Sequence, residues 1–215
     1  MVKTRLAQSL PQIAVSDLYR CLLDDTMALA QGLRGVEVAI MCPESDVEDL
    51  SRAGFDAIRI VPQRGDGLAA GLTSVFAHFA AAGHRRIIAF NSDSPHLPAS
   101  VLESAFEALT TCDLVVGPTH DGGYYLVGAT TSHPRLFAGD GMGTTNAFQA
   151  LVGRAQTLGL SVHLTDPFYD IDEVADVMRL AAELQRVPAR APRTAEWLQR
   201  WGEAVPQAAH SGGDQ

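Results

Sequence analysis

Asp93 stands just beyond an apolar run, at a position where a carboxylate can meet a ligand. The run RRIIAF (85–90) has the length and composition of a buried strand, and FNSDSP (90–95) continues the chain from it. In open α/β sheets, ligands gather beyond the carboxyl ends of the strands, which places Asp93 as a functional acid. The alternative is that Asp93 or Ser94 caps the helix that Pro98 opens.

A second group of acids occurs in YDIDEVAD (169–176). If DID is extended, its period of two places Asp170 and Asp172 on one face and Ile171 on the other. Two neighbouring carboxylates attract a hard divalent cation. Alternatively, Asp172 caps a helix that begins at Glu173, and the two roles can coexist.

The segment GPTHDGGYYLVG (117–128) combines glycines with polar and aromatic groups. Gly122 and Gly123 allow the backbone to turn tightly or to approach a ligand, and Asp121 and Tyr124 add an acceptor and a ring. DGG is also a good hairpin turn, and in isolation that alternative is favoured.

Two further segments have the chemistry of phosphate binding. KTRL brings Lys3 and Arg5 beside an expected helix start, and such cations contact phosphate oxygens. QRGDGLAAGL (63–72) brings three glycines to a loop-to-helix entry, where free N–H groups can face a ligand. Solvated charge near a chain terminus is the simpler explanation of Lys3 and Arg5.

The other polar residues favour neither a zinc site nor acyl chemistry. The three cysteines are far apart and form no CxxC pair. Ser92 and Ser94 lack the GxSxG context of a nucleophilic serine. Five histidines do not pair at ligand spacing on one helix face and are typical of surface or packing positions: His78, His84, His96, His120 and His163.

The apolar pattern predicts the scaffold that must position these residues. Strands are expected at 36–43, 57–62, 85–90, 113–118 and 124–130, with another near 160–165. Helices are expected at 16–33, 44–54, 67–83, 98–112, near 145–158 and at 172–187. This alternation predicts a three-layer α/β/α fold with a mainly parallel, Rossmann-like sheet over residues 1–187. Residues 188–215 are expected to form a C-terminal helix and a flexible tail.

Charge and hydropathy limit the partners of this 215-residue chain. Its formal charge of -9 disfavours general attraction to nucleic acid or to an anionic membrane, so a bound phosphate must be held locally. No charged-then-apolar leader opens the sequence, and no apolar run approaches the roughly 18 residues that cross a bilayer. We therefore expect a cytoplasmic protein that acts on small molecules.

Taken together, the motifs resemble a known family. KTRL, QRGDGL, NSDSPHLP, GPTHDGGYYLVGA and DIDEVAD occur in the order seen in bacterial nucleotide-diphospho-sugar transferase-like proteins, mostly described as glycosyltransferases. The resemblance runs from about residue 2 to about residue 182, and SDSP and DGGYYL are its most specific parts. More distantly, the sequence is similar to phospholactate and molybdenum-cofactor guanylyltransferases, which share the glycosyltransferase-A type of fold.

The resemblance implies a role for each motif. Asp93 and Asp172, with Asp170 as the other member of the acid pair, match metal ligands for Mg²⁺ or Mn²⁺, and Asp93 and Asp121 are the candidate catalytic acids. The remaining matches contact the nucleotide, its phosphates, or the acceptor or sugar: Lys3, Arg5, Gln63, Gly65, Gly67, Leu68, Ser92, Gly122, Gly123 and Tyr124.

The sequence departs from the family pattern at its start. The family begins with a strand and a Pro/Gly-rich loop ahead of KTRL, whereas here Met1 and Val2 stand where that loop ends. The resemblance therefore implies a fold without its first strand. Either the chain is a truncated or late-started version, or its nucleotide site is damaged.

Three functions are compatible with these features. The favoured one is metal-dependent transfer of a sugar from a nucleotide donor to an acceptor. The first alternative is nucleotidyl transfer from a nucleoside triphosphate to a phospho-acid or sugar phosphate, with release of pyrophosphate. The second alternative is a non-catalytic nucleotide-binding protein.

Overall fold

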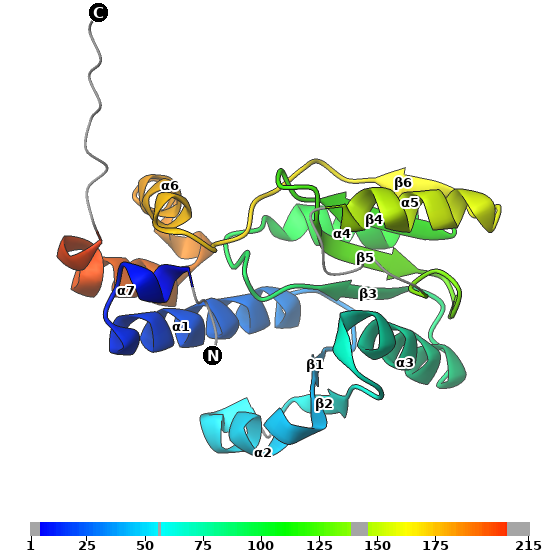
Figure 1. Ribbon diagram of the computed structural model, residues 1–215, viewed down its shortest axis with the longest axis horizontal. Coiled ribbons are helices and arrows are strands. Elements are labelled where there is room, and N and C mark those ends of the chain that lie inside the picture. The colour runs from blue at the N-terminus through cyan, green and yellow to red at the C-terminus, as the bar shows by residue number, and fades with distance from the viewer. Residues whose placement is uncertain (1–4, 56, 139–145, 206–215) are drawn as a thin grey trace, which may run out of the picture. The chain divides into compact units, whose positions relative to one another are not determined.

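The computed structural model describes residues 5–55, 57–138 and 146–205 of the chain, which divides by its internal contacts into two compact units. The helical unit comprises Met1–Ala30, Ser92–Pro98 and Tyr169–Gln215. The sheet unit comprises Gln31–Asn91 and Ala99–Phe168. Each unit therefore combines segments that are distant in the sequence (Figure 1).

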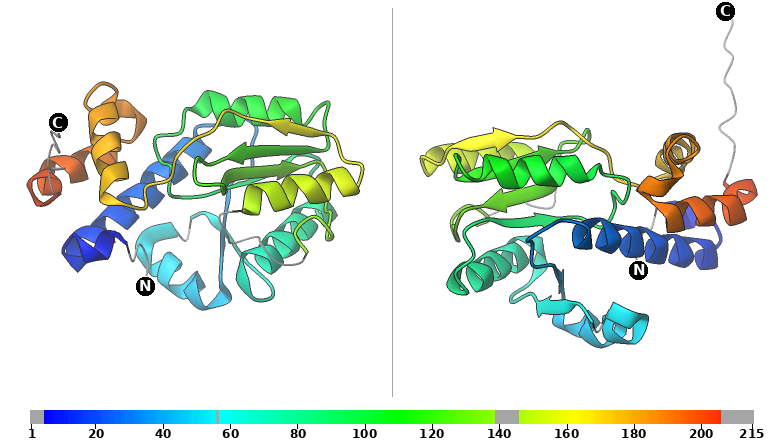
Figure 2. Two further views of the ribbon diagram at one scale, coloured as in Figure 1. Left: turned by 45° about the horizontal axis from the view of Figure 1, so that its top comes forward. Right: turned by 180° about the vertical axis from the view of Figure 1, so that it is seen from behind.

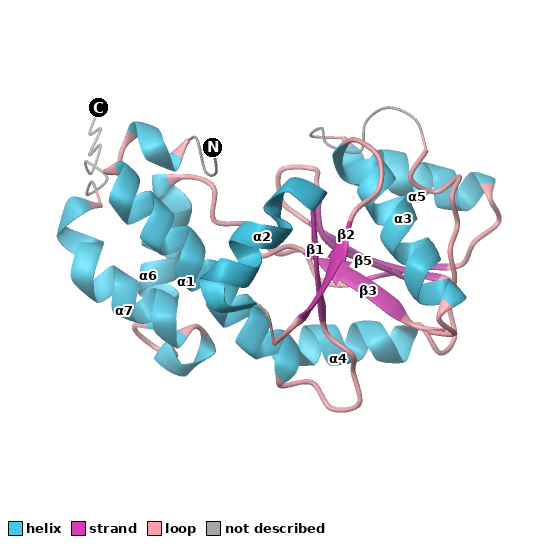
Figure 3. Ribbon diagram, turned by 90° about the horizontal axis from the view of Figure 1, so that it is seen from below, coloured by secondary structure: helices cyan, strands magenta, loops and turns pink. Residues whose placement is uncertain are grey.

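The sheet unit contains all the described strands, arranged in two sheets (Figure 3). In the smaller sheet β1 (Ala39–Cys42) and β2 (Arg59–Pro62) are parallel. The larger sheet has the order β3-β5-β4-β6, with β3 (Ile87–Phe90), β4 (Leu114–Pro118), β5 (Tyr124–Ala129) and β6 (Val162–Leu164). Each predicted strand is present, and each is somewhat shorter than its apolar run.

The direction of β5 corrects one detail of the prediction. β5 is antiparallel to both β3 and β4, whereas β4 and β6 are parallel. The cause is the short connection between β4 and β5, which reverses the chain as a hairpin, because a parallel neighbour would need a longer crossover. The larger sheet is therefore mixed, and the expectation of a mainly parallel sheet does not hold there.

Helices cover both faces of the larger sheet, as the predicted three layers require. The helices of this unit are α2 (Val47–Leu50), α3 (Gly67–Ala81), α4 (Ala99–Ala108) and α5 (Ala147–Thr157), with the short turns η2 (Glu44–Asp46) and η3 (Ser51–Phe55). Phe76 of α3 and Leu151 of α5 share a buried cluster with Leu114 and Val116 of β4. α4 lies on the opposite face, where its Leu102 is 1% exposed (Figure 2).

In its described residues, the helical unit combines α-helices and short 3-10 helices with the inserted segment Ser92–Pro98. Its elements are η1 (Leu6–Gln8), α1 (Gln12–Gln31), α6 (Val174–Leu184), η4 (Pro188–Arg190), α7 (Pro192–Trp201) and η5 (Gly202–Ala204), and the last residue of α1, Gln31, falls in the sheet unit. Trp197 and Trp201, four residues apart on α7, pack into the core that contains Leu22 of α1 and Val177 of α6. The indole Nε1 of Trp197 donates to the carbonyl oxygen of Ala14 at 2.9 Å, which fixes α7 to α1.

The boundary expected at residue 187 stays a prediction, and residues 206–215 of the expected tail lie outside the described residues. Across the described ranges, the chain forms no helix with both the length and the apolar character needed to cross a membrane.

Candidate functional site

The segment after β3 and the segment before α6 lie side by side in the helical unit. The backbone N–H of Ile171 donates to the carbonyl oxygen of Asp93 at 2.9 Å. The hydroxyl of Ser94 lies 3.0 Å from the carbonyl oxygen of Tyr169 and 2.9 Å from Oδ1 of Asp170, and it donates to this pair of acceptors. Two groups of acids that are more than seventy residues apart are thus joined by hydrogen bonds.

The period of two predicted for DID is visible in the burial of the side chains. Ile171 is 0% exposed and belongs to the core of the helical unit, whereas Asp170 and Asp172 are partly exposed. The two carboxylates therefore lie on the side of the segment away from the core, as expected.

The start of α6 decides between two roles of Asp172. The N-cap of α6 is Glu173, in a capping box: its side chain accepts the backbone N–H of Asp176, and the carboxylate of Asp176 accepts the backbone N–H of Glu173 at 2.8 Å. Asp172 is not the N-cap, and its backbone N–H donates to Oδ2 of Asp176 at 3.0 Å. The alternative that Asp172 caps this helix is therefore wrong.

The capping alternative for Ser94 is wrong, whereas that for Asp93 stays a prediction. α4 begins at Ala99, so its N-cap position is occupied by Pro98. Ser94 is instead fully buried and bonded to the segment before α6.

Arg5 lies near the acids, as an ion pair shows. Its Nη1 is 2.8 Å from Oε1 of Glu173, and both side chains are more than half exposed. Such a pair contributes about 0–1 kcal/mol to stability, so its interest is its position beside the acid segment. Lys3, the other predicted phosphate contact, lies outside the described residues.

In the sheet unit, the glycine-rich loop forms the entry of α3. Gly65 and Gly67 have φ values of +81° and +77°, in the region that favours glycine. A Cβ on Gly65 would also lie 2.8 Å from Cβ of Ala70. The N–H of Gln63 donates to the carbonyl oxygen of Cys42 at 2.8 Å, and Leu68 is 45% exposed. This geometry leaves a compact turn before a helix N-terminus, and the predicted contact with a base stays a prediction.

The DGG motif forms the hairpin between β4 and β5, which confirms its structural alternative. The carboxylate of Asp121 accepts hydrogen bonds from the hydroxyl of Thr119 and from the N–H of Gly123. Gly122 has φ +92°, and a Cβ on Gly123 would lie 2.8 Å from Oγ1 of Thr119. These contacts account for each residue of the motif, and the predicted roles of Asp121, Gly122 and Gly123 in chemistry stay predictions.

Tyr124 is directed into the core by an irregularity of β5. Pro118 pairs with Tyr124, but its neighbour Gly117 pairs with Leu126, so Tyr125 is an extra residue on β5. Tyr124 consequently packs against the core of the sheet unit, where burial raises its pKa to about 12. The phenol stays neutral at physiological pH, and its predicted contact with a sugar remains untested.

The residues that the structure brings together can be compared with the requirements of a metal ion. Within the described ranges, no cluster of three or more His, Cys, Asp or Glu side chains is arranged to hold a metal. Mg²⁺, however, is usually held by one or two carboxylates together with waters and substrate phosphates. Asp93, with Asp170 or Asp172 on the adjoining segment, would supply carboxylates of this kind, and the predicted cation site stays a prediction.

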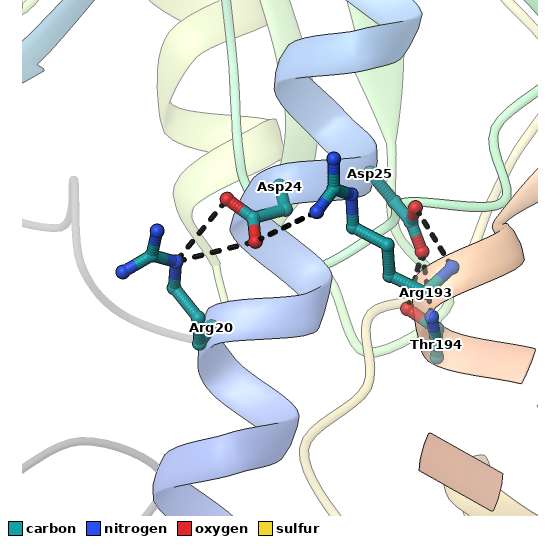
Figure 4. Close-up of polar contacts among 5 residues, drawn as sticks. All are labelled: Arg20, Asp24, Asp25, Arg193 and Thr194. Atoms are coloured by element: carbon teal, nitrogen blue, oxygen red, sulfur yellow. Dashed lines mark hydrogen bonds and ion pairs between the residues drawn. The ribbon is translucent and has the colours of Figure 1, made fainter. Parts of the chain in front are cut away.

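Asp25 is an important residue that the motifs did not indicate. Its carboxylate is 2% exposed and accepts the backbone N–H groups of Arg193 at 3.2 Å and Thr194 at 2.8 Å, and the hydroxyl of Thr194 at 2.8 Å (Figure 4). Since the N-cap of α7 is an alanine, Asp25 supplies the missing acceptor from α1. Leu18, Leu22 and Asp25 have the spacing of residues on one face of a helix, and this face of α1 is buried. That spacing is the feature of the sequence from which a buried role of Asp25 could have been predicted.

His96 is a packing residue, as its sequence context indicated. It is 0% exposed, and its ring centroid lies 4.6 Å from that of Tyr169. The guanidinium of Arg179 lies 3.7 Å from the Tyr169 centroid, and Oε2 of Glu183 lies 3.9 Å from Nε2 of His96. Burial, with smaller contributions from Arg190 and Arg179, lowers the pKa of His96 to about 3, so the imidazole is neutral.

Comparisons with known proteins identify related sequences and folds. The family model described as "Uncharacterized protein conserved in bacteria (DUF2064)" matches residues 26–144. That match contains Asp93, the glycine-rich loop and the DGG hairpin, and it ends before the acids at 170 and 172. No protein with a curated description matches the chain.

One of the similar solved structures is described as a "putative nucleotide-diphospho-sugar transferase" from Desulfovibrio desulfuricans G20. It has a TM-score of 0.87 and 24% identity, and the match covers 95% of this chain and 90% of that one. The homolog of Mycobacterium tuberculosis rv0371c from Mycobacterium sp. strain JC1 has a TM-score of 0.51 and 21% identity, with coverages of 77% and 84%. Molybdopterin-guanine dinucleotide biosynthesis protein A from Archaeoglobus fulgidus has a TM-score of 0.44 and 13% identity, with coverages of 83% and 86%.

These likenesses confirm the predicted resemblance and fold. The Desulfovibrio protein carries the description that the motifs indicated, and its backbone matches nearly the whole chain. At 24% identity the match shows the fold, and the likeness to the Archaeoglobus protein is too weak to add an argument.

Proposed function

Because this chain belongs to the bacterial family DUF2064 and has the fold of the Desulfovibrio protein, we propose that it transfers a group from a nucleotide donor. The transferred group is a sugar, in keeping with the description of the Desulfovibrio protein. In this reaction the bond between the sugar's anomeric carbon and the diphosphate breaks, and a bond from that carbon to an acceptor oxygen forms. The nucleoside diphosphate is the leaving group.

One observation carries the proposal: the structure joins the two acid segments. The bond from Ile171 N–H to the Asp93 carbonyl oxygen fixes the backbones side by side, and the Ser94 hydroxyl binds the Asp170 carboxylate. The closeness of the two backbones supports the proposal that carboxylates from both segments serve a single cation.

The proposed cation is Mg²⁺ or Mn²⁺, held by Asp93 and by Asp170 or Asp172. Bound there, it would offset the charge that grows on the leaving diphosphate. The acids act as ionised ligands of the cation. Arg5, at the same end of the acid segment, is proposed to contact a phosphate oxygen, because a guanidinium suits that geometry.

The sheet unit supplies separate proposals. The turn at Gly65 and Gly67 brings backbone N–H groups to the start of α3, which supports a role in nucleotide binding. Asp121 and Tyr124 already have structural roles, so the proposed chemistry does not depend on them. A cytoplasmic location stays a prediction.

Product analysis distinguishes the chemistries. The protein is incubated with Mn²⁺ and a panel of labelled nucleotide sugars, and separately with each nucleoside triphosphate plus phospho-acids or sugar phosphates. Release of nucleoside diphosphate with transfer of the label supports sugar transfer. Release of pyrophosphate, from cleavage between the α- and β-phosphates, would show that the reaction is nucleotidyl transfer and not sugar transfer. Tight nucleotide binding without either product would leave a nucleotide-binding protein.

Substitution of the acids tests the proposed cation site directly. Asp93→Asn and Asp170→Asn keep the size of each side chain but remove its charge, so we expect Mn²⁺ binding to weaken by at least about 10-fold in calorimetric titration with a nucleotide present. Asp17→Asn is the matched control: Asp17 is an exposed acid of α1, 3.8 Å from Arg200, and its loss should leave binding unchanged. Equal Mn²⁺ binding by wild type and both variants would remove these residues from the site.

A further inference from the structure

Three successive residues around Asp93 are held by other parts of the helical unit. The hydroxyl of Thr26 donates to the carbonyl oxygen of Ser92 at 3.3 Å. The carbonyl oxygen of Asp93 accepts the N–H of Ile171 at 2.9 Å. The next residue, Ser94, is anchored through its own hydroxyl.

Thr26 connects this segment to a rigid part of the unit. It is 4% exposed, and it follows Asp25, whose carboxylate holds the start of α7. Two adjacent residues of one turn of α1 therefore hold α7 and the Asp93 segment. Because the helix backbone is held by its own hydrogen bonds, the Cβ that carries the Thr26 hydroxyl has a set position.

Ser94 connects the same segment to the second group of acids. It is 0% exposed, and its single hydroxyl proton serves the Tyr169 carbonyl oxygen and Oδ1 of Asp170. The terminal torsion of an aspartate side chain is soft, so a carboxylate without such a donor rotates over a broad range. The hydrogen bond from Ser94 restricts that rotation for Asp170.

From these contacts we infer that Thr26 and Ser94 are positioning residues, which hold Asp93 and Asp170 side by side for the cation. The inference rests on the proposed function for what the acids bind. Neither hydroxyl contacts the substrate in this role. Thr26 sets the backbone before Asp93, and Ser94 sets the carboxylate of Asp170.

The first test measures positioning without metal. Thr26→Val keeps the shape of the side chain and removes its donor, and Ser94→Ala removes the hydroxyl. We expect the amide hydrogen of Ile171 to exchange faster in both variants, because its acceptor, the Asp93 carbonyl, lies in the segment that has been released. Thr26→Ser keeps the hydroxyl and should restore slow exchange, and Ser94→Cys, a weak donor of similar size, should fall between wild type and Ser94→Ala.

The second test measures Mn²⁺ affinity of the full chain by calorimetry. Loss of a group that orients a metal ligand typically weakens binding 10–100-fold, so we expect about 10-fold for Thr26→Val and for Ser94→Ala. Thr157→Val is the matched control, because its hydroxyl donates to the Gly153 carbonyl within α5 of the sheet unit. It should change neither Ile171 exchange nor Mn²⁺ binding.

The two readouts separate this inference from the proposed function. Unchanged Ile171 exchange, or unchanged Mn²⁺ affinity in variants of a wild type that binds Mn²⁺, would overturn the positioning roles. If wild type itself binds no Mn²⁺, the proposed cation site fails, and faster exchange in the variants would still support the hold of these hydroxyls on the Asp93 segment.

Discussion

Asp172 and Asp176 lie four residues apart at the start of α6, and the carboxylate in the capping box of this helix is that of Asp176. Asp176 accepts the N–H groups of Asp172 and Glu173, so it completes the capping box. We expect Asp176→Ala to lower the free energy of unfolding by about 1 kcal/mol, and by more than Asp172→Ala does, because Asp176 belongs to the capping box. Urea unfolding of both variants checks the difference. A larger loss for Asp172→Ala would restore its capping role.

His96 predicts a pH dependence of stability. Its folded pKa of about 3 lies below the unfolded value of 6.5, so the unfolded chain binds the proton more readily. The contribution of the neutral imidazole to the free energy of unfolding is complete above pH 6.5 and is lost as the pH falls towards 3. At pH 5 the free energy of unfolding is therefore about 2 kcal/mol lower than at pH 8 on account of His96, since each pH unit between the two pKa values is worth 1.36 kcal/mol.

The measurement compares wild type with His96→Leu, a substitution of similar volume. The free energy of unfolding of the variant should fall less steeply between pH 6.5 and pH 5 than that of wild type. Nearby Glu183, Arg179 and Arg190 are present in both proteins, so the difference in slope isolates the imidazole. Parallel pH profiles would show that His96 takes up a proton in the folded chain as readily as in the unfolded chain.

At the scale of elements, α7 depends on an acceptor from another helix. The first N–H groups of a helix lack partners within it, and the carboxylate of Asp25 accepts those of Arg193 and Thr194. A negative charge is also favourable at a helix N-terminus. The attachment of α7 to the helical unit therefore combines this cap with the burial of Trp197.

Removal of the Asp25 carboxylate should destabilise α7. Asp25→Ala leaves the N–H groups of Arg193 and Thr194 without this acceptor in a buried place, and we expect a loss of about 3 kcal/mol. The neighbouring Asp24→Ala loses ion pairs with Arg20 and Arg193 and should cost about 1 kcal/mol or less. Urea unfolding followed by tryptophan fluorescence reports on α7, which carries both tryptophans. Equal losses in the two variants would contradict the capping role.

At the scale of the whole molecule, the chain passes between its two units several times. The candidate metal ligands are all in the helical unit, whereas the glycine-rich loop and the DGG hairpin are in the sheet unit. Tryptophan fluorescence therefore reports unfolding of the helical unit, which holds the acids, and far-ultraviolet circular dichroism reports unfolding of both units.

A ligand that binds the folded chain stabilises it by mass action. Mn²⁺ together with the donor nucleotide should raise the thermal midpoint of wild type. A ligand at 100 times its dissociation constant adds about 2.7 kcal/mol, which is roughly 5–10 °C for a chain of this size. Asp93→Asn, or wild type with a chelator, should lack the metal-dependent part of the shift. An unchanged midpoint at saturating Mn²⁺ and nucleotide would contradict the proposed function.

Local pattern was sufficient for much of this protein. The helical spacing of GLAAGLTSVFAHFAAAG predicted a helix, and α3 is present there. The period of two in DID predicted the buried Ile171 between two acids that lie outside the core. These features depend on residues close together in the sequence, because side-chain direction repeats with the backbone of each element.

The tertiary structure decided the features that depend on distant partners. The pairing of β5 with β3 followed from the fold, as did the cap of α7, which comes from Asp25 on α1. The hydrogen bonds that hold the Asp93 segment come from α1 and from the segment before α6. No local pattern specifies such contacts, because a hydroxyl or carboxylate has the same sequence signature whether it caps a helix, closes a turn or faces a ligand. Only the fold determines which donors and acceptors lie within hydrogen-bonding distance.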